Sequence, residues 1–110
     1  MEKPNAVIWK YPLTITDEQV LQLPSSHRVL SVHRRGVEQL CLWALVDPTP
    51  GPLHPVCILL VGAGQKTLFM APDAVSRIPM YREDGTPFRF LNTVLLYDGA
   101  LVLHAFCEEW

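Results

Sequence analysis

The sequence predicts an all-β protein, an antiparallel sandwich or partly closed barrel of about six or seven strands with one short helical segment. Three observations lead to this prediction. Two runs, residues 40–46 and 56–61, are apolar at every position. Other short runs alternate apolar with polar residues, the period of a half-buried strand. Asp98-Gly99 separates two further apolar runs, which is typical of a two-residue type I′ hairpin.

The run 40–46 is the predicted central strand. It is too short for a free-standing helix and ends at Asp47-Pro48, where proline removes a donor. Successive side chains of a strand point to opposite faces, so both faces of this strand are apolar and we expect both to be buried. The predicted core contains residues from this strand and its neighbours: Trp43, Leu45, Ile58, Leu60, Val94 and Leu103.

The first strand begins at Val7 and is expected to stop at Pro12. Residues 16–19 then match the S/T-x-x-E/Q capping pattern, which would open a short helix. Pro24 leaves room for only about two helical turns, and short helices are marginal. We therefore favour a strand over residues 19–23.

Residues 28–33 alternate again and lead through the turn at 34–36 into the central strand, which predicts a hairpin. Four prolines in residues 47–55 predict a stiff connection that cannot join a sheet, and a docking ridge is the less favoured interpretation. Residues 56–61 form a second buried strand. In the hairpin at Asp98-Gly99, Thr93 should face His104 and Leu91 should face Phe106.

Residues 65–87 form an irregular insertion or flap within a single domain of 110 residues. One or two helical turns are predicted over residues 72–78, between two prolines. The segment either folds back over the β structure, which we favour, or exposes an apolar patch that marks a binding surface. Its candidate partner- or ligand-binding residues are Phe69, Met70, Arg77, Met80, Tyr81 and Arg82.

Catalytic and metal-binding motifs are missing from the sequence. The four histidines lack metal-ligand spacing and the carboxylates lie in pairs at turns or at the end of the chain. We therefore expect no enzyme, no cofactor and no metal. Cys41, Cys57 and Cys107 lie in apolar runs without CxxC spacing, which predicts buried free thiols.

The net charge is −2, with charges scattered along the chain, which argues against specific nucleic-acid binding. The basic group His33, Arg34 and Arg35 with Arg28 is too small to hold a nucleic acid strongly. No apolar run approaches the ~20 residues needed to cross a membrane, and the start lacks a signal-peptide pattern, so we expect a cytoplasmic location. The 49% hydrophobic content favours a subunit interface, hence a possible homo-oligomer.

The chain resembles a family of small proteins of unknown function encoded by phages, prophages and bacteria. The resemblance rests on Ile8-Trp9-Lys10-Tyr11, on residues 19–24, 30–32 and 42–48, on Gly62-Ala63-Gly64, and on residues 99–102 with His104 and Phe106. Residues 65–87 are longer than the usual connection, and the family more often has Gly-Thr-Gly at 62–64. The resemblance implies an accessory phage protein and no catalytic residues.

Together these observations favour a non-enzymatic binding protein that inhibits or sequesters a host component, such as a defence system. Its partner would be a host protein or a small nucleotide. For a nucleotide, Arg77, Arg82 and Arg89 could contact phosphate while Tyr81 or Trp43 stacks on the base. The alternative is a small virion structural or assembly module that oligomerises through its sheet edges.

Overall fold

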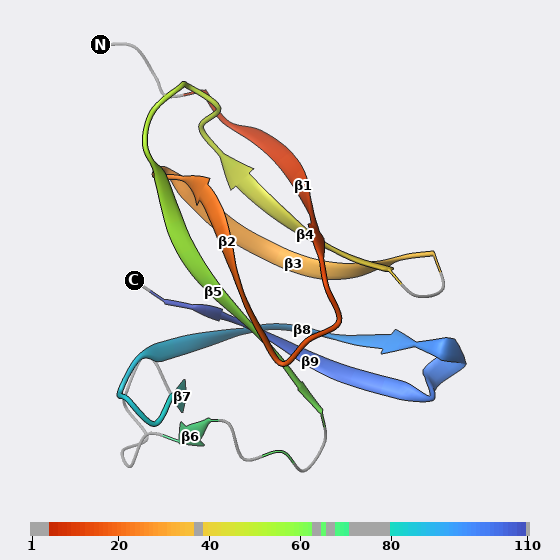
Figure 1. Ribbon diagram of the computed structural model, residues 1–110. Coiled ribbons are helices and arrows are strands. Elements are labelled where there is room, and N and C mark those ends of the chain that lie inside the picture. The colour runs from red at the N-terminus through yellow and green to blue at the C-terminus, as the bar shows by residue number, and fades with distance from the viewer. Residues whose placement is uncertain (1–4, 37–38, 63–64, 66–67, 71–79, 110) are drawn as a thin grey trace.

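The protein is a two-sheet antiparallel β structure in a computed structural model that describes residues 5–36, 39–62, 65, 68–70 and 80–109 (Figure 1). One sheet has three strands in the order β1-β4-β3, and the other has six in the order β2-β5-β9-β8-β7-β6. The strands are β1 (Val7–Leu13), β2 (Glu18–Pro24), β3 (His27–Arg35), β4 (Gln39–Val46), β5 (Leu53–Gly62), β6 (Phe69–Met70), β7 (Met80–Tyr81), β8 (Pro87–Leu96) and β9 (Leu101–Glu108).

The predicted all-β class with two antiparallel sheets is confirmed, and no closed barrel forms among the described residues. The strand number is higher than predicted because two-residue strands β6 and β7 extend the larger sheet. The only helical element in the described part is a 3₁₀ turn at Tyr97–Gly99. The helix predicted over residues 72–78 lies outside the described residues.

One core lies between the two sheets and draws residues from both. Strand β4, in the middle of the small sheet, contributes Leu40, Leu42, Ala44 and Val46, none more than 2% exposed. The predicted core residues Ile58, Leu60, Val94 and Leu103 are buried as expected.

The prediction that Trp43 and Leu45 belong to this core is wrong. Trp43 is half-buried and Leu45 is 37% exposed. Both point to the outer face of the small sheet, since successive side chains alternate and Leu42 and Ala44 point inward. No described element covers that outer face at Trp43 and Leu45, although Cys41, further along the same face, is 3% exposed.

Strand β5 meets the opposite situation, because both of its faces are covered. Ile58 and Leu60 belong to the core between the sheets, whereas Cys57 and Leu59 form a second buried cluster with Phe88. Leu68, from the 65–87 segment, packs against that cluster. Whether the 65–87 segment as a whole folds back as a flap stays a prediction, since Phe69 beside Leu68 is 57% exposed.

The edge of β3 is joined to the larger sheet by side chains of β8. The backbone N–H of Val32 donates to Asn92 Oδ1 at 2.9 Å, and Asn92 Nδ2 donates to the Val32 carbonyl at 2.6 Å. Arg89 donates to the carbonyl of Val29 at 2.7 Å. These bonds satisfy backbone groups that an edge strand otherwise leaves to water.

The hairpin at Asp98-Gly99 has type I′ geometry, with φ of 56° at Asp98 and 89° at Gly99 and a 3.0 Å bond from Ala100 N–H to the Tyr97 carbonyl. Thr93 pairs with His104 as predicted. The predicted Leu91–Phe106 pair is wrong, because an irregularity between Phe90 and Asn92 places Phe90 opposite Phe106.

Residues Glu18–Pro24 form strand β2, which confirms the strand favoured over residues 19–23. The alternative, a short helix opening at the capping pattern of residues 16–19, does not form. Strand β1 does not stop at Pro12 as predicted, because its pairing with β4 continues through Pro12 to Leu13. The proline segment also joins a sheet, since β5 begins at Leu53 and Pro55 lies opposite Gln22. Proline is tolerated there because β9 pairs with β5 only from Ile58 onward, leaving one side of Pro55 without a neighbouring strand.

Candidate functional site

The predicted binding residues of the 65–87 segment lie at the end of the larger sheet. Strands β6 and β7 pair Phe69 with Tyr81 and Met70 with Met80. Phe69 is 57% exposed, whereas Met80 and Tyr81 are half-buried. Arg77 lies outside the described residues. The role of this group in binding stays a prediction.

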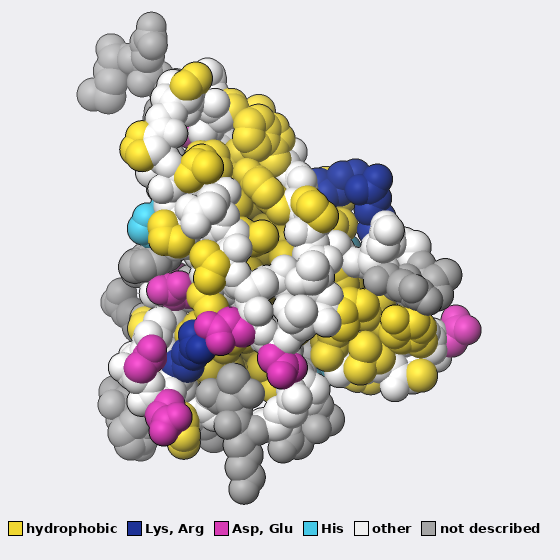
Figure 2. Space-filling view, viewed as in Figure 1, with side chains coloured by type: hydrophobic (Ala, Val, Ile, Leu, Met, Phe, Trp, Pro, Cys, Tyr) yellow, Lys and Arg dark blue, Asp and Glu magenta, His cyan; other side chains and the backbone are white. Residues whose placement is uncertain are grey.

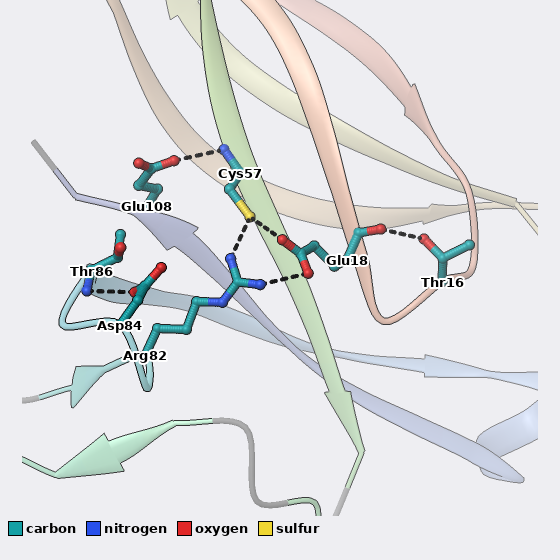
Figure 3. Close-up of polar contacts among 7 residues, drawn as sticks. All are labelled: Thr16, Glu18, Cys57, Arg82, Asp84, Thr86 and Glu108. Atoms are coloured by element: carbon teal, nitrogen blue, oxygen red, sulfur yellow. Dashed lines mark hydrogen bonds and ion pairs between the residues drawn. The ribbon is translucent and has the colours of Figure 1, made fainter.

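Arg82 belongs to a polar cluster on the outer face of the larger sheet (Figure 3). Its guanidinium donates to Glu18 Oε2 at 2.6 Å and lies 3.7 Å from the Cys57 sulfur. The Cys57 thiol donates to Glu18 Oε1 at 3.5 Å, and the backbone N–H of Cys57 donates to Glu108 at 3.1 Å. The cluster joins β2, β5 and β9 to the residue that follows β7.

The electrostatics of this cluster keep the thiol protonated. Burial, followed by the hydrogen bond to Glu18, raises the pKa of Cys57 from 9.0 to about 11, although Arg82 acts in the opposite direction. A nucleophilic cysteine needs a lowered pKa, since the thiolate is the reactive form. The cluster therefore fits a structural contact between strands better than a catalytic centre.

A different group of side chains surrounds Trp43 on the outer face of the small sheet. Register places Lys10 on one side of Trp43 and Ser31 on the other, while the next outward row has Cys41 beside His33. Lys10 Nζ lies 5.7 Å from the centre of a Trp43 ring, a cation–π distance. An open hollow of about 380 Å³ is lined by Lys10, His33, Arg34, Arg35, Cys41 and Trp43, which we call the basic hollow.

The cations of the basic hollow differ from the two arginines that form ion pairs in the described chain; Arg28, exposed on β3, also forms no ion pair with a described carboxylate. Arg82 pairs with Glu18 and Arg89 pairs with Glu109, at 2.6 and 2.8 Å. Lys10, Arg34 and Arg35 are exposed and form no ion pair with a described carboxylate. Figure 2 shows the contrast, with one Lys/Arg group among Asp/Glu side chains at the lower left and another at the upper right with no Asp/Glu beside it in this view.

His33 is positioned within the hollow by its neighbour on the strand. Its Nε2 lies 2.8 Å from Ser31 Oγ, and the thiol of Cys41 donates to the His33 carbonyl at 3.7 Å. Cys41 itself is buried, as are Cys57 and Cys107, and all three thiols are free, which confirms the prediction for the cysteines. No group of three or more potential metal ligands occurs among the described residues.

The sequence had separately indicated the basic group at His33–Arg35 and the stacking capacity of Trp43, but had not brought them together. Lys10 was missed as a site residue. Its alignment with Trp43 depends on the pairing of β1 with β4, which joins residues more than 30 positions apart. The only available signal was that both lie in stretches that carry the family resemblance.

The structure thus defines a two-sheet antiparallel β protein with a basic, aromatic hollow on one outer face. The chain belongs to the family described as Domain of unknown function (DUF7352), whose model matches residues 4–110. No curated protein and no solved structure matches the chain. None of the helices in the described part is long and apolar enough to cross a membrane.

Proposed function

We propose that this protein is a non-enzymatic binding protein, encoded by a phage or prophage, that sequesters a small anionic ligand in the host cytoplasm. Sequestration would inhibit the host component, such as a defence system, that depends on the ligand. The resemblance to phage and prophage proteins supports the origin. The observation that carries the proposal is the convergence beside Trp43 of Lys10, Arg34 and Arg35, none of which pairs with a carboxylate in the described part of the chain.

Charge supports an anionic ligand. The whole chain carries a net charge of −2, yet the basic hollow gathers three formal positive charges without a described carboxylate partner. Like charges at one place repel one another, and a bound anion relieves that repulsion while gaining charge-assisted hydrogen bonds. Arginine suits phosphate or carboxylate particularly well, because its planar fork can bind two oxygens at once.

The size of the hollow supports a small ligand. About 380 Å³ lies at the lower end of the range of roughly 300–1,000 Å³ that small-molecule sites occupy. The described lining of the hollow offers Lys and Arg cations, an indole, the His33 imidazole and the buried Cys41 thiol, groups that together suit binding of an anion with an aromatic part. Sequestration requires only binding.

The second candidate is a virion or assembly module that oligomerises through sheet edges. It is favoured by strand β1, an edge strand of the small sheet that exposes Ile8 by 57% and Trp9 by 45%. An unpaired apolar edge can pair with another chain. Presence of the protein in purified particles, at a fixed ratio to capsid protein, would favour this candidate over the first.

Native mass spectrometry of tagged protein, gently purified from phage-infected host cells, tests the proposal. We expect a small extra mass that denaturation releases, and we expect Arg35→Gln to lose it. Arg82→Gln is the matched control, because it removes the same charge from the other outer face. A bound host protein in place of a small mass, or no extra mass at all, would contradict the proposal.

A further inference from the structure

The two ends of the basic hollow differ in chemistry, and this difference narrows the ligand class. Trp43 is fixed by the central strand of the small sheet, with Ile8, Leu45 and the exposed Arg28 in the adjacent outward row. Toward the β3–β4 turn, the outward rows carry His33 and then Arg35. The hollow therefore has an aromatic ring with Lys10 beside it at one end, and His33 and Arg35 toward the other.

The spacing of these ends matches one kind of molecule. Each residue of a strand advances about 3.3–3.4 Å, so the row of His33 and Cys41 lies about 7 Å from the row of Trp43. That separation is comparable with the distance between the base and the first phosphate of a mononucleotide. The row of Arg35 lies a further two residues along, where a second phosphate would extend.

We infer that the basic hollow binds a nucleotide, whose base stacks on Trp43 while its phosphates contact His33, Arg34 and Arg35. The inference rests on the proposed function and names its ligand class. Lys10 lies beside Trp43 in the same row, with its Nζ over the ring at 5.7 Å from the centre, so it must move aside for a base to stack there and can then reach the phosphate nearest the sugar. The Ser31 hydroxyl lies 2.8 Å from His33 Nε2, which fixes the orientation of the imidazole in the hollow.

Other anions fit only part of the hollow. Inorganic phosphate would use the arginines but not the indole. Strong binding of a long nucleic acid draws on about six to ten phosphate contacts, whereas the described Lys and Arg side chains of the hollow and the row beyond it are Lys10, Arg28, Arg34 and Arg35. An acidic peptide has no flat ring to place on Trp43. A nucleotide uses both ends, because every base presents an aromatic face and phosphate pairs with arginine.

Isothermal titration calorimetry of the intact protein tests the inference with three probes: ADP, adenosine and inorganic pyrophosphate. We expect ADP to bind most tightly, since only ADP has both a base and phosphates. Trp43→Leu should weaken ADP binding about tenfold or more, because stacking contributes about 1–3 kcal/mol per base, and should leave pyrophosphate binding unchanged. Arg35→Gln should weaken both ADP and pyrophosphate.

Trp43→Phe separates stacking from folding, because it keeps an aromatic face and should recover most of the affinity for ADP. Trp9→Leu is the matched control, since Trp9 lies on the other face of β1, outside the basic hollow, and should not change ADP binding. ADP binding that equals pyrophosphate binding, or that survives Trp43→Leu, would overturn the inference. So would the absence of heat with ADP and with a wider panel of linear and cyclic nucleotides.

The inference and the proposed function can fail separately. If native mass spectrometry releases an anion that is not a nucleotide, the inferred ligand class is wrong, but the proposed sequestration of a small anion is supported. A bound host protein in that experiment would overturn both.

Discussion

The two outer faces of this protein are built from similar residues but meet different surroundings. On the larger sheet, Cys57, Leu59 and Phe88 form a buried cluster against which Val61, Leu68 and Phe106 pack. On the small sheet, Trp43 and Leu45 have no described segment above them and remain partly exposed. The charges follow the same division, since Arg82 pairs with Glu18 on the first face and Lys10 lies over an indole on the second.

The comparison shows how one fold can separate stability from binding. The outer face of the larger sheet buries apolar groups and pairs Arg82 with Glu18, so its side chains bind one another and contribute to the stability of the fold. The uncovered face leaves an aromatic ring and several cations available to a ligand. Substitutions on the first should therefore change the free energy of unfolding, and substitutions on the second should mainly change binding.

Truncation of Phe88 should give the largest effect. Its side chain is 0% exposed, so Phe88→Ala removes a buried ring and leaves a cavity, which typically costs about 3–5 kcal/mol. Trp43→Ala, on the uncovered face, should lower the free energy of unfolding by about 1 kcal/mol. Urea unfolding of both variants measures the difference. Equal losses in the free energy of unfolding would mean that side chains of the two faces contribute equally to stability.

The next effect is a loss of stability at high pH. Burial raises the pKa of Cys57 to about 11 and that of Cys107 to about 12, above the 9.0 of an ordinary thiol. The folded state therefore holds these protons more tightly than the unfolded chain does. Their contribution to stability is complete below pH 9 and is lost as the pH rises through about 11 and 12.

Urea unfolding midpoints at pH 7, 9 and 11 measure this loss, and Cys57→Ala isolates the part due to Cys57, because tyrosines and lysines titrate in the same range. The wild type should lose more stability than the variant between pH 9 and 11. A Cys57 thiol that reacts rapidly with iodoacetamide in the native protein at pH 8 would contradict the protonated state described above.

The smallest effect is expected at the ion pair of the covered face. The side chains of Arg82 and Glu18 are 30% and 45% exposed, and exposed pairs contribute about 0–1 kcal/mol. Arg82→Gln should therefore lower the free energy of unfolding by less than about 1 kcal/mol, and 1 M NaCl should reduce the difference. A loss near 3 kcal/mol, unaffected by salt, would show that the pair is buried in solution.

Local chemistry in the sequence predicted the hairpins and most strands. Asp98-Gly99 specifies its turn because both residues adopt positive φ, at 56° and 89°. The same apolar pattern was interpreted correctly for β5 and wrongly for β4. A run of apolar residues shows that a strand avoids polar side chains, but only the tertiary structure decides whether something covers its second face.

The candidate site was less predictable than the fold, because it combines distant residues. His33, Arg34 and Arg35 are adjacent in sequence, and their basic character was visible. Lys10 and Trp43 meet only through the register of β1 with β4. A single chain contains no local signal for that register, and a bulge between Val29 and Ser31 further changes which side chains of β3 face outward.

The paired hydrogen bonds between Asn92 and Val32 have a consequence for solubility. The side-chain amide of Asn92 offers the same donor and acceptor as a peptide group, so it occupies β3 where another strand would otherwise pair. A neighbouring strand that added itself to that edge would have to displace this amide at Val32. Loss of this amide would open the edge to self-association, so aggregation on storage would reveal its absence before any change in binding.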